Sequence, residues 1–180
     1  LEQPRLILVL IYLRIFRFAG AEFTVICREI LSMMILAFLV NLLDTLIPKG
    51  KKVLVLGSGG ASKTAQAVLC DMGARSVVVI SRSGENNYTN LHLHRDAEII
   101  VNTTPVGMYP NVGISPVDLN TFPVLEGVFD LIFNPAHTKM LLDAEQRGIP
   151  AVNGLLMLVA QAKESAEWFT GNKIPDETIL

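Results

Sequence analysis

The sequence predicts an α/β fold: a doubly wound, mostly parallel sheet preceded by an apolar, helical N-terminal segment. Three observations lead to this fold class. Short apolar runs bounded by glycine recur from residue 48 onward, segments of helical periodicity separate them, and a glycine-rich turn joins the first run to the first helix. Strands buried on both faces of a parallel sheet are continuously apolar, and their alternation with helices implies right-handed crossovers.

Residues 1–47 differ in character from the remainder, so we expect two parts, 1–47 and 48–180. Dense apolar runs at 6–13 and 30–43 are separated by charged residues. A membrane-spanning helix needs about 20 largely apolar residues, and runs of about 10–14 more often become buried helices. We therefore expect helices that need a partner surface, with a membrane anchor as the less favoured alternative.

The elements after residue 48 follow from local patterns. The run KKVLVLG at 51–57 is apolar and closed by glycine, which favours a buried strand. The segment 62–74 carries apolar residues at helical spacing and reaches a stop signal at Gly73. Further strands are expected at 76–81, 98–102, 127–133 and 149–153, and further helices at 137–148 and 154–169.

Composition limits the classes of function. A net charge of -2 and a charged fraction of 18% leave no basic face for nucleic acid. Cys27 and Cys70 are far apart and form no C-x-x-C pair, which indicates reduced, mostly buried thiols in a cytoplasmic protein. His92 and His94 alternate without a third ligand type nearby, so no metal site is indicated.

The turn in VLVLGSGGASKT, residues 53–64, resembles the first turn of a dinucleotide-binding βαβ unit. In that unit Gly57 makes the tight turn and Gly59 lets the backbone approach a pyrophosphate. A third small residue allows the helix to pack closely on the strand, and Ser62 is small enough for that position. This interpretation makes 48–180 a Rossmann-like domain.

The same turn also resembles the phosphate loop of ATPases, but Ser62 stands where that motif needs glycine. An ATPase also needs a magnesium-binding aspartate at the end of a second strand. Two of the expected strands end in Ser81 and Asn102, and Asp130 is expected inside the fourth strand run. Lys63 is expected to face solvent. The dinucleotide interpretation is therefore favoured.

The end of the second expected strand indicates which dinucleotide binds. An NAD site usually places Asp or Glu there to bind the ribose 2′-hydroxyl. Here the strand ends in SRS, and Glu85 lies beyond the expected position. Arg82 can pair with a 2′-phosphate in bidentate fashion, and Ser81 and Ser83 add hydroxyl donors. The sequence therefore predicts NADP.

Two further segments carry a resemblance to a known family. VNTTPVGMYPN at 101–111 and NGLLMLVAQA at 153–162, together with GSGGAS, SRS and FDLIFNPAHTKMLLDAEQRG, resemble the C-terminal half of shikimate dehydrogenase over about residues 49–171. The resemblance implies NADPH-dependent reduction of 3-dehydroshikimate to shikimate, in aromatic amino acid biosynthesis. Quinate and methylene-tetrahydrofolate dehydrogenases share the glycine turn but are less compatible with N-T-T-P-V-G-M.

The resemblance also implies roles for individual residues. The pyrophosphate would lie on Gly57, Ser58, Gly59, Gly60 and Ala61, the 2′-phosphate on Ser81, Arg82 and Ser83, and the ribose and nicotinamide against Asn102, Thr103, Thr104, Met108, Gly154 and Met157. Gln161 would contact a hydroxyl of the small-molecule substrate. Phe133 would line the substrate pocket where the family commonly has tyrosine, which removes one hydrogen bond.

The first part of the chain departs from the family pattern. Family members carry a substrate domain with an S-x-S motif, an N-V-T-x-P-x-K segment with the catalytic lysine, and an N-T-D segment with a catalytic aspartate. None of these appears in residues 1–47, so catalytic residues stay unassigned and little turnover is expected from this chain alone. We interpret 1–47 as a truncated, frame-shifted or remnant substrate domain. The alternative function is an NADP-binding module that acts with a separate substrate domain.

Overall fold

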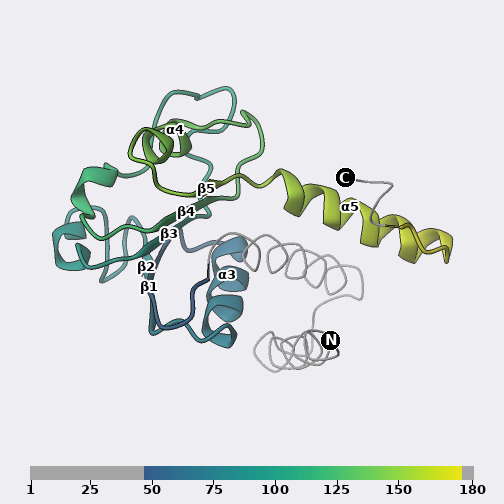
Figure 1. Cartoon of the computed structure of the whole chain (residues 1–180), viewed down its shortest axis with the longest axis horizontal. Coiled ribbons are helices and arrows are strands. Elements are labelled where there is room, and N and C mark those ends of the chain that lie inside the picture. Colours follow the sequence, from purple (N-terminus) through teal and green to yellow (C-terminus); the bar gives the residue numbers. More distant parts are fainter. Residues whose placement is uncertain (1–46, 176–180) are drawn as a thin grey trace.

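The computed structural model describes residues 47–175, and the expected apolar helices of residues 1–46 lie outside this range. The described residues contain a five-stranded parallel sheet in the order β2-β1-β3-β4-β5. Its strands are β1 Lys52–Leu56, β2 Ser76–Ile80, β3 Ile99–Asn102, β4 Gly127–Asp130 and β5 Ala151–Val152. Figure 1 shows the strands side by side with helices on either side. The expected parallel sheet is confirmed.

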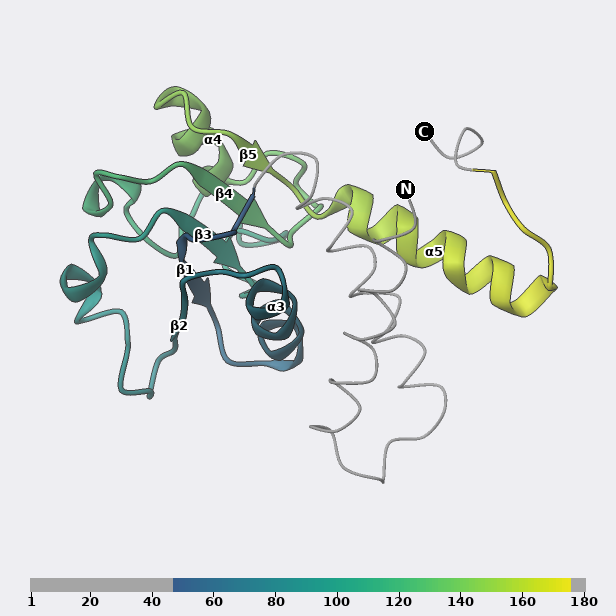
Figure 2. The ribbon, with the colours of Figure 1, turned by 60° about the horizontal axis from the view of Figure 1, so that its bottom comes forward.

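Helices cover both faces of this sheet. The α-helices are α3 Gly60–Asp71, α4 Lys139–Gln146 and α5 Leu155–Thr170, and the short 3-10 helices are η1 Leu91–His94 and η2 Leu119–Thr121. Figures 1 and 2 place α3 on one side of the sheet and α4 on the other, while α5 runs outward from the end of β5. The doubly wound arrangement is therefore also confirmed. In the described range, no helix is long and apolar enough to cross a bilayer.

The alternation of side chains along β1 divides the core into two clusters. Successive strand residues point to opposite faces. Val53 and Val55 pack with the buried side of α3, where Val68 and Leu69 are fully buried. Leu54 lies in the opposite cluster, which collects these residues from β2, the η2 region and α4: Ile80, Leu119, Phe122, Met140, Leu141 and Ala144. Every residue of β1 after Lys52 is fully buried, as expected for a central parallel strand.

Several boundaries differ from the sequence prediction. The helix α3 begins at Gly60, inside the glycine turn, two residues before the expected start. The expected strand at 127–133 ends at Asp130, because its pairing with β3 stops at the Asn102–Asp130 pair. The prediction of a mostly buried Cys70 was wrong: this thiol is exposed on α3, while Cys27 lies outside the described residues.

The amino end of the sheet carries a group of ion pairs. Lys51 Nζ lies 2.5 Å from Glu126 Oε2, Lys52 Nζ lies 2.5 Å from Asp96 Oδ1, and Arg75 Nη2 lies 3.0 Å from Glu98 Oε2. The hydrogen bond that Lys51 donates to Glu126 raises the pKa of Lys51 despite the opposing effect of desolvation. These lysines therefore lie, already paired, at the end of the sheet opposite the glycine turn.

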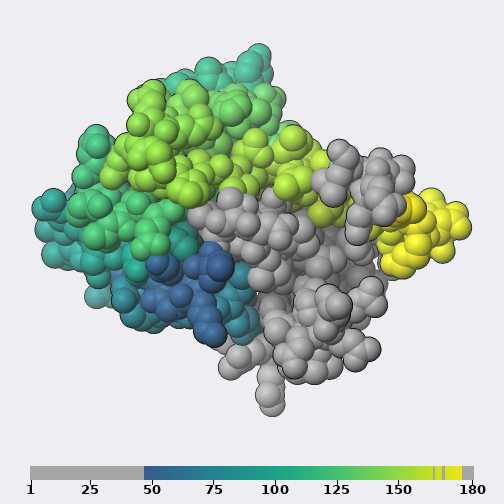
Figure 3. Space-filling model, in the orientation of Figure 1, coloured from purple at the N-terminus to yellow at the C-terminus, as the bar shows by residue number. Residues whose placement is uncertain are grey.

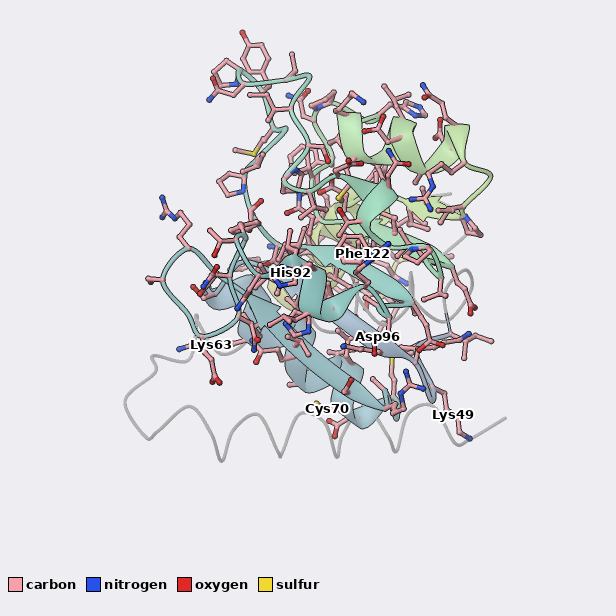
Figure 4. All side chains as sticks on the ribbon, turned by 90° about the vertical axis from the view of Figure 1, so that its left-hand side faces the viewer. Lys49, Lys63, Cys70, His92, Asp96 and Phe122 are labelled. Atoms are coloured by element: carbon pink, nitrogen blue, oxygen red, sulfur yellow. The ribbon has the colours of Figure 1, made fainter. Side chains whose placement is uncertain are left out.

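We expect Phe122→Ala to lower the free energy of unfolding by about 3–5 kcal/mol, because it empties the space of a fully buried ring. Figure 4 shows Phe122 between the sheet and α4. Urea denaturation measures the change. Leu93→Ala is the control: Leu93 is 63% exposed, so its removal should change stability by no more than about 0.5 kcal/mol. Equal losses in the two variants would contradict this description of the core.

Candidate functional site

The order of the strands determines where a ligand can bind. The chain adds β2 on one side of β1 and then β3 on the other side, so the connections diverge at the carboxyl ends of β1 and β3. In open α/β sheets, ligands bind in the crevice outside such a point. Leu56, the last residue of β1, is in register with Ile80 of β2 and Asn102 of β3. The segments after these three strands therefore meet at one edge.

The turn after β1 is built on the conformation of Gly57. This residue has a φ of 105° and donates its N–H to the Ile80 carbonyl at 2.8 Å. A Cβ at Gly57 would lie 2.8 Å from Thr103 Oγ1, so both the backbone and the neighbouring loop require glycine. In contrast, a Cβ at Gly59 or Gly60 would meet no atom of residues 47–175 within 4 Å. Gly57 is thus packed against the loop after β3, whereas Gly59 and Gly60 lie on the exposed side of the turn.

The helix α3 begins at this exposed turn without a side-chain cap. Its N-cap residue Gly59 provides no side-chain hydrogen bond, and its first turn contains no acidic residue. The first N–H groups of a helix lack partners within the helix and carry partial positive charge, which together favour an anion. Ser62 is fully buried and bonded to Gln66, as the small-residue position requires, while Lys63 is exposed. Figure 4 shows Lys63 and Lys49 at opposite ends of the sheet.

The loop after β3 is tied to β1 and to its own first residue. Both the N–H and the hydroxyl of Thr103 donate to the Leu56 carbonyl, at 2.9 and 2.6 Å. Asn102 Oδ1 accepts the N–H of Thr104 at 2.9 Å and its hydroxyl at 2.7 Å. Both threonine hydroxyl protons are therefore bound within the protein, and Thr104 Oγ1 also accepts the N–H of Val106 at 3.3 Å.

A buried carboxylate at the end of β4 stands behind this loop, and the sequence analysis did not identify its role. Asp130 is fully buried and accepts hydrogen bonds from Asn102 Nδ2 at 3.0 Å, Ile132 N at 3.1 Å and Thr138 Oγ1 at 2.7 Å. Burial raises the pKa of Asp130, and the hydrogen bonds, that of Thr138 foremost, oppose the increase. The prediction that Asp130 lies inside the strand was wrong, because β4 ends at this residue. Protein groups donate hydrogen bonds to both of its carboxylate oxygens.

The turn after β2 places an arginine beside the glycine turn. Ser81 donates its N–H to the Asn86 carbonyl at 3.1 Å, which closes the turn. Arg82 is exposed, and within residues 47–175 its guanidinium makes no hydrogen bond or ion pair. Its charge does reach Tyr88: burial raises the pKa of Tyr88 and Arg82 opposes that increase. Ser83 is exposed and Ser81 is half-buried.

The remaining predicted residues are more dispersed. Met108 is 43% exposed and Phe133 is 44% exposed, on the segments that follow β3 and β4. Met157 and Gln161 are half-buried in α5, which leaves the sheet and ends at the yellow tip in Figure 3. A Cβ at Gly154 would lie 2.0 Å from the Leu131 carbonyl oxygen. Packing of the backbone therefore requires glycine at 154 whether or not a cofactor contacts it.

Comparison with known proteins finds similar sequences and similar structures. No family model matches the chain. A shikimate dehydrogenase (NADP(+)) of Caldicellulosiruptor bescii is 41% identical over 142 residues, which cover 67% of this chain and 49% of that protein. This chain is related to the shikimate dehydrogenases. It spans about half the length of the curated shikimate dehydrogenases it matches.

Solved shikimate dehydrogenases share the fold. Shikimate dehydrogenase 1 of Peptoclostridium difficile matches with a TM-score of 0.76 and 33% identity, over 82% of this chain and 58% of that one. A shikimate 5-dehydrogenase of Thermus thermophilus, solved in complex with NADP(H) and shikimate, matches with a TM-score of 0.68 and 29% identity, over 81% of this chain and 59% of that one. The expected resemblance to this family is confirmed.

The two glycines of the turn should respond differently to alanine. Gly57→Ala forces a side chain into a positive φ and against Thr103, so we expect a loss of about 1–3 kcal/mol in the free energy of unfolding. Gly59→Ala meets open space at a negative φ and should change stability by less than about 1 kcal/mol. Urea denaturation of both variants measures this, and a Gly59 variant as unstable as the Gly57 variant would refute the described turn.

Proposed function

We propose that this chain supplies the NADP-binding part of a shikimate dehydrogenase-like oxidoreductase, which reduces 3-dehydroshikimate to shikimate with NADPH in aromatic amino acid biosynthesis. One observation carries the proposal: the exposed glycine turn at the switch point leads into a helix without a side-chain cap, and at the end of the adjacent strand lies Arg82, which has no partner within residues 47–175. Of the relatives named above, the Caldicellulosiruptor bescii protein is NADP-dependent by name, and the Thermus thermophilus enzyme was solved with NADP(H).

The residues fit a phosphorylated dinucleotide. The open side of Gly59 and Gly60 leaves room for a diphosphate against the first N–H groups of α3. Neighbouring strands lie about 4.8 Å apart, so the turn after β2 begins within reach of an adenosine that extends from the turn after β1. Arg82 can bind the 2′-phosphate with two parallel hydrogen bonds. The pyrophosphate residues of the proposal are Gly57, Ser58, Gly59, Gly60 and Ala61, and the 2′-phosphate residues are Ser81, Arg82 and Ser83.

The segments after β3, β4 and β5 form the other side of the proposed site. The loop from Asn102 to Thr104 adjoins the glycine turn directly through the contact between Thr103 and Gly57. We assign the ribose and nicotinamide to Asn102, Thr103, Thr104, Met108, Gly154 and Met157, and the substrate to Gln161 and Phe133. Phe133 offers an apolar surface without a hydroxyl, so it can exclude water but cannot donate a hydrogen bond.

Bound NADPH would supply the hydride, and residues 47–175 would hold and orient the cofactor. Holding reactants in the correct geometry lowers the barrier of such a transfer. The reaction also needs a proton donor. Lys51 and Lys52 lie at the amino end of the sheet in ion pairs, so we do not assign them this role. We propose that the acid–base groups lie outside residues 47–175. The boundary between residues 47 and 48 and the cytoplasmic location stay predictions.

Replacing Arg82 with alanine tests the cofactor. We expect NADP+ to bind more weakly by about 1.5–3 kcal/mol, the scale of hydrogen bonds to a charged group, while NAD+ affinity stays unchanged. Calorimetric titration of both cofactors measures the difference. Arg95→Ala, which removes another exposed arginine, serves as the control and should affect neither cofactor. Equal weakening of NADP+ and NAD+ in the Arg82 variant would exclude the 2′-phosphate assignment.

Turnover by the purified chain tests whether the acid–base groups are separate from the cofactor-binding residues. With NADP+ and shikimate we expect a turnover rate far below that of a typical enzyme, which is about 10 s⁻¹. The reason is that we assign the acid–base groups to a region outside residues 47–175. Formation of NADPH, followed by absorbance, measures the rate, and the intact Peptoclostridium difficile enzyme provides the reference. A rate equal to that reference would show that the chain contains its own acid–base groups.

A further inference from the structure

Hydrogen bonds, joined through the peptide link between Thr103 and Thr104, connect the carboxyl ends of β1, β3 and β4. The path begins at Thr138, the N-cap of α4, whose hydroxyl donates to Asp130 and accepts the N–H of Leu141. It continues from Asp130 to the amide of Asn102 and from there to Thr104. The next residue back, Thr103, closes the path to β1 through the Leu56 carbonyl. The loop after β3 is thus held from both sides.

The carboxylate of Asp130 imposes one orientation on Asn102. An ionised carboxylate only accepts hydrogen bonds, whereas an amide has one donor end and one acceptor end. With Asp130 behind it, Asn102 must turn its NH2 group toward the carboxylate, and its Oδ1 then faces Thr104. The reverse orientation would place Oδ1 against Asp130 Oδ1 and the NH2 group against the N–H of Thr104, which loses both interactions.

Stability alone does not explain why a carboxylate is buried at residue 130. Asp130 is fully buried, and within residues 47–175 its hydrogen-bond partners are the neutral groups of Asn102, Ile132 and Thr138. A buried charge is expensive unless it is well compensated, and an apolar residue of similar volume is often no less stable. A neutral Asn102–Thr104 turn could form without it. What the charge adds is a second constraint, besides the Thr104 N–H, on the orientation of the Asn102 amide.

We propose that Asp130 is a positioning residue, which fixes the Asn102 amide and through it the loop that receives the nicotinamide half of the cofactor. This inference rests on the proposed function for the identity of the ligand. Asp130 contacts Asn102 rather than the assigned ligand, so it acts through Asn102 and Thr104. The glycine turn and Arg82, to which we assign the phosphates, make no hydrogen bond to this amide within residues 47–175.

Two ligands separate this role from a general effect on folding. NADP+ carries both halves of the cofactor, whereas adenosine 2′,5′-bisphosphate carries the 2′-phosphate and one 5′-phosphate without a nicotinamide. We expect Asp130→Asn, which removes the acceptor-only constraint with little change in shape, to weaken NADP+ by about tenfold and to leave the bisphosphate affinity unchanged. Calorimetric titration of both ligands measures this.

Asp118→Asn is the matched control. Asp118 Oδ1 also accepts the N–H two residues ahead, from Asn120 at 2.9 Å, but on the exposed start of η2. The same change of charge there should leave the affinity for both ligands as in the wild type. Loss of NADP+ affinity in this control would show that the effect does not depend on Asn102 and would overturn the inference.

Thr138 provides a second, independent pair of variants. Thr138→Val removes the hydroxyl that orients Asp130 and should reproduce the selective loss of NADP+, whereas Thr138→Ser keeps the hydroxyl and should restore affinity. This pair decides the matter if Asp130→Asn does not fold. Equal affinities of wild type and variants for NADP+, or equal losses for both ligands, overturn the positioning role while the proposed function stands. A wild-type chain that binds neither ligand overturns the proposed function and this inference with it.

Discussion

The close approach of Gly57 to Thr103 is the constraint on which the carboxyl edge of the sheet depends. Because β1 lies between β2 and β3, the turn that follows it must pass between two other segments. Thr103 donates twice to the Leu56 carbonyl, and the N–H of Gly57 donates to Ile80, so the turn is fixed from both neighbours. A side chain at residue 57 has no room. The next three residues, 58–60, are exposed and lead into the first turn of α3.

Charged side chains are compensated in different ways at the two ends of the sheet. At the amino end, Lys51, Lys52 and Arg75 pair with carboxylates, and these charges are compensated within the protein. At the carboxyl end, Asp130 is compensated by neutral donors, and within residues 47–175 neither Arg82 nor the start of α3 has an acidic partner. Among the described residues, this difference favours an anionic ligand at the carboxyl end over the amino end.

The sequence was sufficient to predict the sheet, because buried parallel strands leave continuous apolar runs and glycine marks the first turn. It was not sufficient for features that depend on register. Asp130 matters because β3 and β4 pair it with Asn102, and no local pattern contains that pairing. Gly154 shows the same limit: the resemblance assigned it to the cofactor, but the Leu131 carbonyl already requires glycine there. Cys70 was placed wrongly because helix α3 turns it away from the buried face that Leu69 occupies.

The two anion-recognising features of the site differ in physical kind, and this difference bears on specificity. Several N–H groups of a helix start distribute partial charge over a diphosphate, which NAD and NADP both possess. A guanidinium is a full charge with fixed donor geometry, and it distinguishes a phosphate from a hydroxyl. The glycine turn can thus provide affinity for either dinucleotide, whereas only the turn after β2 can choose between them. The absence of a carboxylate at Ser81, Arg82 and Ser83 removes the group that would favour a ribose hydroxyl, so attraction and the lack of repulsion act in the same direction.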